Sequence, residues 1–141
     1  MSVEIDMGDL VIRINSLREK LDDSRKILKR AAAHAQTIIL SRTAEGRDVN
    51  GQTFLEYSED YAKLRSELGL PTTPDLFKTG KMLGSMTDTI LDYIAYIHFG
   101  TGEEGSKALY NNKSREFFAI SSDEETDIVA SIREDIFNGV L

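Results

Sequence analysis

Two histidines are the side chains of this sequence best suited to acid–base chemistry or metal binding. His34 lies in a run of alanines, and His98 lies between Ile97 and Phe99. A zinc site needs His, Cys, Asp or Glu ligands at close spacing, and neither histidine has that spacing with the other or with a nearby carboxylate. We therefore interpret His34 as a packed or partly exposed helical residue, and His98 as a structural residue that forms a hydrogen bond.

Several other short motifs contain groups that bind ions or transfer protons in other proteins. Residues 80–81 and 100–102 contain glycine but are too short for a P-loop or a dinucleotide fingerprint. Asp48-Val49-Asn50-Gly51 lacks the further oxygen ligands and the closing Glu of a calcium loop. The acidic groups at 103–104 and 123–125 are explained by a solvated loop and by a helix N-terminus, where negative charge is favourable. The sequence thus predicts no enzyme activity, no cofactor and no metal site.

The N-terminal part of the chain carries the pattern of a long amphipathic helix. We predict a helix over residues 9–40, with Asp9 as its N-cap. A helix of this length, at about 1.5 Å per residue, is longer than a small domain is wide. Its apolar face either lies wholly in the core or partly contacts another subunit. The apolar positions that recur at steps of three and four include Leu10, Ile14, Leu17, Leu21, Leu28, Ala35 and Ile39.

Residues 42–84 form the most informative stretch, a long segment that is punctuated by turns but rich in aromatic and aliphatic side chains. Asp48-Val49-Asn50-Gly51 predicts an exposed turn of type I′. Phe54 and Tyr57 are expected to pin the segment to the body, and Ser58 to cap a short helix. Long loops in compact domains are usually functional.

The C-terminal part of the chain is predicted to form a small sheet followed by a helix. Residues 85–120 contain a hairpin with its turn at Leu91-Asp92, and a third strand at 115–120. Residues 100–113 have the composition of an exposed, mobile loop. A last helix over 122–138 begins with a capping box.

Length and composition agree with one folded domain. The chain has 141 residues, of which 40% are hydrophobic and 29% charged, enough for one hydrophobic core. We expect a single α+β domain over residues 1–141. In it, a long N-terminal helix and a C-terminal helix pack on a small, mostly antiparallel sheet, with a long, partly helical surface loop over residues 42–84.

The charge balance and the absence of cysteine restrict the function further. A net charge of -7 argues against tight sequence-independent binding to nucleic acid, although an acidic wall past which DNA slides is compatible with it. The chain has no cysteine, which fits a reducing compartment. The first residues, MSVEIDMGDL, lack a signal sequence, and no apolar stretch approaches the roughly 20 residues that span a bilayer. We expect folding in the cytosol and no membrane partner.

Four blocks of the sequence follow one another in an order known from one protein family. They are RTAEGRDVNGQTFLEYSEDYAKLR, DLFKTGKMLGSM, YIAYIHFGTG and SREFFAISSDEETDIVASI. The residues that match the family motifs are Gly46, Asp48, Asn50, Gly51, Phe54, Tyr57, Ser58, Tyr61, Ala62, Lys63, Leu76, Thr79, Gly80, Met82, Leu83, Ser85, Tyr93, Tyr96, His98, Phe99, Gly100, Arg115, Phe117, Phe118 and Ser121. Over about residues 9–137 the chain resembles the virion-morphogenesis, or tail-completion, family of long-tailed bacteriophages of the Mu type.

The resemblance implies a structural virion protein with no catalytic cycle, a subunit of a ring, often hexameric, at the head–tail junction. Its partners would be further copies of itself, a head-side connector or stopper, and the tail tube, while DNA passes without specific binding. Its location would be the virion neck, after assembly in the host cytoplasm. The residues expected to dock the loop or to form ring contacts are Asp48, Asn50, Gly51, Phe54, Tyr57, Tyr61, Leu76, Thr79, Gly80, Leu83, Tyr96, His98 and Phe99.

Three alternatives stay open at this point. A tail terminator or another neck ring protein would share the same physical features. An acidic intracellular regulator would bind a host protein through the same long helix. A small hydrolase would require His98 to lie near a Ser or a carboxylate.

Overall fold

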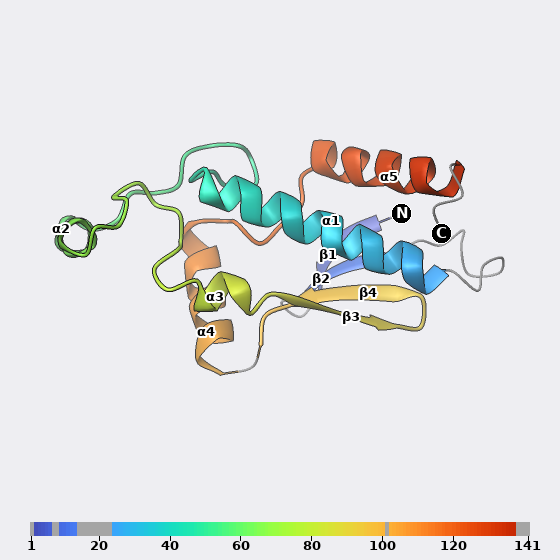
Figure 1. Ribbon diagram of the computed structural model, residues 1–141, viewed down its shortest axis with the longest axis horizontal. Coiled ribbons are helices and arrows are strands. Elements are labelled where there is room, and N and C mark those ends of the chain that lie inside the picture. The colour runs from blue at the N-terminus through green and yellow to red at the C-terminus, as the bar shows by residue number, and fades with distance from the viewer. Residues whose placement is uncertain (1, 7–8, 14–23, 101, 138–141) are drawn as a thin grey trace.

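Two pairs of strands, each pair followed by helices, form one antiparallel sheet in the described part of the chain. The computed structural model describes residues 2–6, 9–13, 24–100 and 102–137. Its elements are β1 (Ser2–Asp6), β2 (Asp9–Arg13), α1 (Ser24–Ala44), α2 (Glu59–Glu67), α3 (Lys81–Gly84), β3 (Thr87–Leu91), β4 (Ile94–His98), α4 (Glu103–Ser114) and α5 (Ser122–Phe137). The strand order is β1-β2-β4-β3, α1 packs on β2, β3 and β4, and α5 packs on α1 (Figure 1). The predicted α+β class is confirmed.

The N-terminal helix begins later than the sequence predicted, because the first part of the predicted helix is a strand. Asp9–Arg13 is β2, which pairs with β4 in the middle of the sheet, so Asp9 is not a helix N-cap. The side chains of residues 10–12 are all buried, and a strand that is buried on both faces reads as an unbroken apolar run. Helix α1 ends at Ala44, beyond the predicted end, and residues 14–23 lie outside the described residues.

The β3–β4 hairpin is present, with its turn one residue later than predicted. Leu91 pairs with Ile94, so Leu91 belongs to the strand and the turn consists of Asp92 and Tyr93. Their φ angles are +47° and +64°. A two-residue turn in which both φ angles are positive is of type I′.

Residues Glu103–Ser114 form α4, although the composition of 100–113 predicted a loose, mobile loop. Lys107 lies 2.8 Å from a carboxylate oxygen of Glu103 and 3.4 Å from one of Glu104, one helical turn away. Ala108, the next residue, is buried in the core. The spacing of these side chains therefore indicates a helix, even though the segment as a whole is polar.

The segment 115–120, predicted as a third strand of this region, is irregular. The buried Arg42 of α1 donates from Nη2 to Phe117 O at 2.7 Å and to Ala119 O at 2.9 Å. Glu116 O accepts from the backbone N of Val49 at 2.9 Å, and no neighbouring strand of the described residues pairs with the segment. The aromatic rings are buried as predicted, with Phe117 0% and Phe118 5% exposed.

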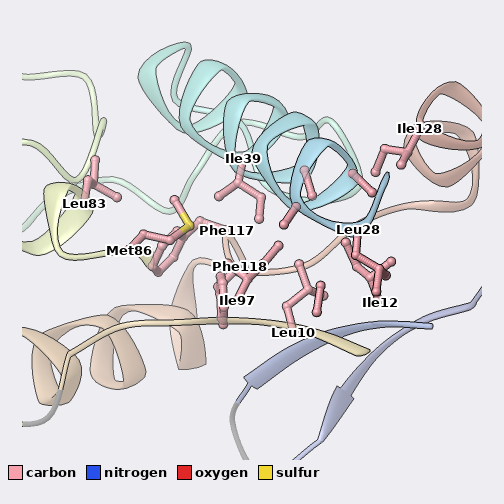
Figure 2. Packing of buried hydrophobic residues seen from close by; sticks show 14 of the residues in the cluster. Leu10, Ile12, Leu28, Ile39, Leu83, Met86, Ile97, Phe117, Phe118 and Ile128 are labelled. Carbon is pink, nitrogen blue, oxygen red and sulfur yellow. The ribbon is translucent and has the colours of Figure 1, made fainter. Parts of the chain in front are cut away.

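The hydrophobic core lies between α1 and the sheet and extends to α5. Figure 2 shows α1 side chains facing those of the strands and of the segment before α5, among them Leu10, Ile12, Leu28, Ile39, Ile97, Phe117, Phe118 and Ile128. The predicted capping box opens α5: Ser121 Oγ accepts from Glu124 N at 3.2 Å, and Glu124 Oε2 accepts from Ser121 N at 3.1 Å.

Candidate functional site

The segment between α1 and α3 leaves the body of the protein and returns to it. We call residues 47–80 the arm, and Figure 1 shows its helix, α2, at one end of the long axis and well apart from the sheet. Ser58 caps α2 as predicted, because its Oγ accepts from Tyr61 N at 3.3 Å. Among the described residues of the arm, only Phe54 and Leu76 join the core cluster or pack against it. The arm therefore depends mainly on its own contacts.

The outgoing and returning parts of the chain touch at the base of the arm. Gly46 has a φ of +73°, and a Cβ atom on it would lie 2.8 Å from Pro74 O. Phe54 N donates to Gly46 O at 2.8 Å, so the first loop of the arm also contacts Gly46. Only glycine combines this φ with so close an approach of another backbone.

The predicted turn at residues 48–51 is present, but it is not of type I′. Asp48 Oδ1 accepts from the backbone N of Asn50 and of Gln52, both at 2.9 Å, and Gly51 N donates to Asp48 O at 3.0 Å. Gly51 has a φ of +76°, whereas Asn50 is not among the residues with positive φ. The aspartate side chain thus closes the turn locally, as Asp often does.

The buried side chain of Arg65 joins several parts of the arm. Arg65 of α2 is 1% exposed, and it donates from Nε to Pro71 O at 2.7 Å and from Nη2 to Asp75 Oδ1 at 2.9 Å. Its guanidinium carbon lies 4.9 Å from the centre of the Tyr57 ring and 5.8 Å from that of Tyr61. Burial acts to lower the pKa of Arg65, but its contacts with Tyr61, Tyr57 and Asp75 raise the pKa above its usual value, so the group stays charged.

A second arginine attaches the arm to the body. Arg115, which follows α4, donates from Nε to Leu55 O at 2.7 Å and from Nη2 to Glu56 O at 2.9 Å. Its guanidinium carbon lies 5.0 Å from the centre of the Tyr57 ring, and the Tyr57 hydroxyl accepts from Leu76 N at 3.1 Å. Tyr57 therefore contacts two guanidinium groups and joins the outgoing and returning parts of the arm.

An open cleft of about 610 Å³ lies between the arm and α4, and we call it the arm cleft. Aromatic rings line both sides of it, with Tyr57 and Tyr61 on the arm and Tyr110 on α4. Its charged lining side chains are mostly basic: Arg65, Lys78, Lys107 and Arg115, against the single acid Glu104.

Two of these four cations have no carboxylate partner among the described residues. Arg65 and Lys107 are each paired with carboxylates. Arg115 binds carbonyl oxygens, and Lys78 makes no hydrogen bond or ion pair within the described part of the chain. The arm cleft is therefore a positively charged region of a chain whose net charge is -7.

The residues predicted as an interaction set fall into separate places. Those that line the arm cleft are Tyr57, Tyr61, Leu76, Thr79 and Gly80. Those that form the turn in the arm are Asp48, Asn50 and Gly51. Those in the core or packed against it are Phe54, Leu83 and Phe99, together with Leu76, which also lines the cleft. Those on β4 are Tyr96 and His98.

The α4 side of the cleft was missed from the sequence, because that segment was read as a loop. Lys107 and Tyr110 lie three residues apart on α4, a spacing that places side chains on one helix face. The pair Glu103–Lys107, at a spacing of four, was the available signal. This pairing lowers the pKa of Glu103 and raises the pKa of Lys107.

The two histidines have the structural positions that the sequence predicted. His98 Nε2 lies 2.9 Å from Thr89 Oγ1 on the neighbouring strand. His34 is half-buried on α1, where it lines a shallow cavity beside the ion pair of Arg30 and Asp135. Within the described residues, no group of three or more His, Asp or Glu side chains is placed to hold a metal ion, and no helix is long and apolar enough to span a membrane.

Apart from Leu40 on α1, the large apolar side chains that are exposed lie in three regions of the described chain. On the arm, Leu55 is 64% exposed and Leu68 is 55% exposed. On α4, Tyr110 is 74% exposed. At the β3–β4 turn, Leu91 is 58% and Tyr93 45% exposed. These regions are candidates for surfaces that contact other molecules.

Comparisons with protein-family models, with curated protein sequences and with solved structures found no match to this chain.

Proposed function

We propose that this protein is a structural virion protein of a long-tailed bacteriophage, a neck or tail-completion subunit that forms a ring at the head–tail junction. The observation that carries the proposal is the arm, which projects from the body and yet is held in shape by its own contacts around Arg65. A preorganised projection loses little conformational entropy when it docks on a neighbouring subunit.

The surface of the arm supports a role in subunit contacts. Leu64 of α2 is 42% exposed, and Leu68, directly after the helix, is 55% exposed. Phe77, on the part of the arm that returns to the body, is 50% exposed. A helix that carries such side chains at the end of a projection gains stability when a partner covers them. The first two sequence blocks that resemble the tail-completion family include residues 47–65 and 75–80 of this arm.

The charge of the chain supports a place beside DNA without binding to it. A net charge of -7 repels the phosphate backbone, so DNA slides past such a surface without sticking. The polar groups inside the arm are already bound to one another, with the Arg65 guanidinium on Pro71 and Asp75. This arrangement suits a structural subunit better than an enzyme.

Deletion of the gene in a phage that encodes this chain tests the proposal. We expect complete heads and complete tails that remain unjoined in electron micrographs, and restored joining when the chain is supplied in trans. Tails of abnormal length would instead assign the chain to tail termination. Normal head–tail joining in the deletion mutant would refute the proposal, and a persistent monomer bound to one host protein would favour the acidic regulator.

A further inference from the structure

The turn between β3 and β4 presents three side chains that have no partner in the described chain. We call Leu91, Asp92 and Tyr93 the tip. Leu91 is 58% and Tyr93 45% exposed, and Asp92 is exposed as well. Neither the Asp92 carboxylate nor the Tyr93 hydroxyl makes a hydrogen bond or ion pair with the described residues. The tip therefore combines an anion that has no partner among the described residues with two exposed apolar groups.

The backbone of the tip favours residues other than those it carries. The φ angles of +47° at Asp92 and +64° at Tyr93 are those of a type I′ turn, which Asn-Gly forms with least strain. A tyrosine in the left-handed region is strained, because its Cβ crowds the backbone. Strain of this kind in an exposed turn points to a use for the side chain itself.

The arm cleft offers the groups that the tip lacks. Lys78 and Arg115 are the two cations of the cleft without a carboxylate partner among the described residues, and they suit the Asp92 carboxylate. The tyrosine rings of the cleft suit the apolar parts of the tip.

The tip and the arm cleft of one chain lie far apart. Figure 1 shows α2 and the β3–β4 turn toward opposite ends of the long axis, so the two surfaces of one molecule do not meet. We infer that the tip of one copy inserts into the arm cleft of the next copy. A contact between two different surfaces is heterologous: it repeats head to tail, and it closes into a ring when the rotation allows.

This inference rests on the proposed ring-forming function, and it names the two surfaces that join neighbouring subunits. Because the chain has no cysteine, single introduced thiols report the contact without interference. We would prepare Leu91→Cys at the tip, and Thr79→Cys and Asn111→Cys at the cleft as two independent cleft variants, so that Asp92, Lys78 and Arg115 stay in place. Each is oxidised mildly, alone and in equimolar mixture with the tip variant.

The expected result is a disulfide-linked dimer in the tip–cleft mixtures, about tenfold or more above either variant alone, because a specific contact raises the effective concentration of the two thiols. As a control, Thr126→Cys takes the place of the tip variant in the mixtures. Thr126 is exposed on α5 near its acidic first turn, so this variant tests whether any exposed thiol beside negative charge links to the cleft. Equal linking of the cleft thiols to Thr126→Cys, dimers of each variant with itself only, or no linking by either cleft thiol would each overturn the inference.

A second measurement separates loss of the contact from loss of the fold. The double variant Asp92→Asn, Tyr93→Gly suits the type I′ turn better than the natural pair, so the hairpin is retained. We expect it to keep the circular dichroism spectrum of the original chain but to lose self-association in sedimentation, and the original association to weaken as salt is raised. Unchanged self-association would overturn the inference.

The two proposals fail in different ways. Ring-shaped particles in micrographs of the purified chain without a tip–cleft disulfide would remove this contact and leave the proposed function standing. A tip–cleft disulfide together with normal head–tail joining in the deletion mutant would leave the contact standing and remove the function.

Discussion

Replacement of Arg65 by alanine is expected to release the arm without unfolding the body. The guanidinium is 1% exposed and makes two hydrogen bonds, to Pro71 O and to Asp75 Oδ1. A net hydrogen bond of a charged group contributes about 1.5–3 kcal/mol. Loss of one partner of a buried ion pair costs about 3–5 kcal/mol, which already includes the bond to the carboxylate. The bond to Pro71 O adds to this loss and the partial exposure of Asp75 reduces it, so we take about 3–5 kcal/mol as the loss in free energy of arm opening.

Native-state hydrogen exchange measures this loss locally. At about 1.4 kcal/mol per factor of ten, amides of α2 should exchange roughly a hundred- to a few thousand-fold faster in Arg65→Ala. Amides of α1 should keep their rates, because α1 belongs to the core cluster and Arg65 does not. Lys63→Ala is the matched control, since it removes an exposed cation from the same helix.

Two results would refute this reasoning. If α1 and α2 exchange faster by the same factor, the arm unfolds together with the body and is not a separate unit. If α2 exchanges at the same rate in Arg65→Ala and in Lys63→Ala, the contacts of Arg65 do not hold the arm.

Three further substitutions test the rest of the fold. Gly46→Ala should lower the free energy of unfolding by about 1–2 kcal/mol because its φ is positive, and by a further amount because the new Cβ contacts Pro74 O. Gly51→Ala meets open space, so it should show only the loss that comes from the positive φ. Equal shifts of the two variants in thermal unfolding would contradict the close approach at Gly46. Ser121→Ala should cost about 1 kcal/mol, seen as a lower urea midpoint at constant slope, and an unchanged midpoint would deny the capping box. Phe117→Ala, at a fully buried position, should cost about 3–5 kcal/mol; a urea titration that retains most of the stability would show that the ring is not part of the core.

The features that the sequence predicted correctly are those whose interactions span a few residues. Ser58 caps α2 through an amide three residues later, and Ser121 and Glu124 bind each other's backbone over the same distance. The turn that begins at Asp48 is likewise closed by its own side chain. Such signals are readable because donor and acceptor are fixed by local spacing.

The wrong predictions concern segments whose secondary structure depends on contacts with distant parts of the chain. Asp9–Arg13 fits a helical period together with the residues that follow, but it is a strand because Leu10 lies opposite Ile97 in the sheet. Short apolar runs do not distinguish strand from helix by periodicity alone. The segment 115–120 has strand composition, but Arg42 binds the carbonyl groups of Phe117 and Ala119 in place of a neighbouring strand.

The sequence by itself determined the fold class, the caps that begin α2 and α5, the presence of the turn in the arm, the C-terminal helix and the acidic character of the chain, because these follow from composition and short spacings. Only the tertiary structure decided which contacts hold the arm and that a basic cleft lies beside it. Arg115 meets the carbonyl of Leu55 across 60 residues, and Arg65 is buried by a chain reversal that brings Asp75 to it. No local pattern encodes such contacts, since they depend on where the folded chain returns.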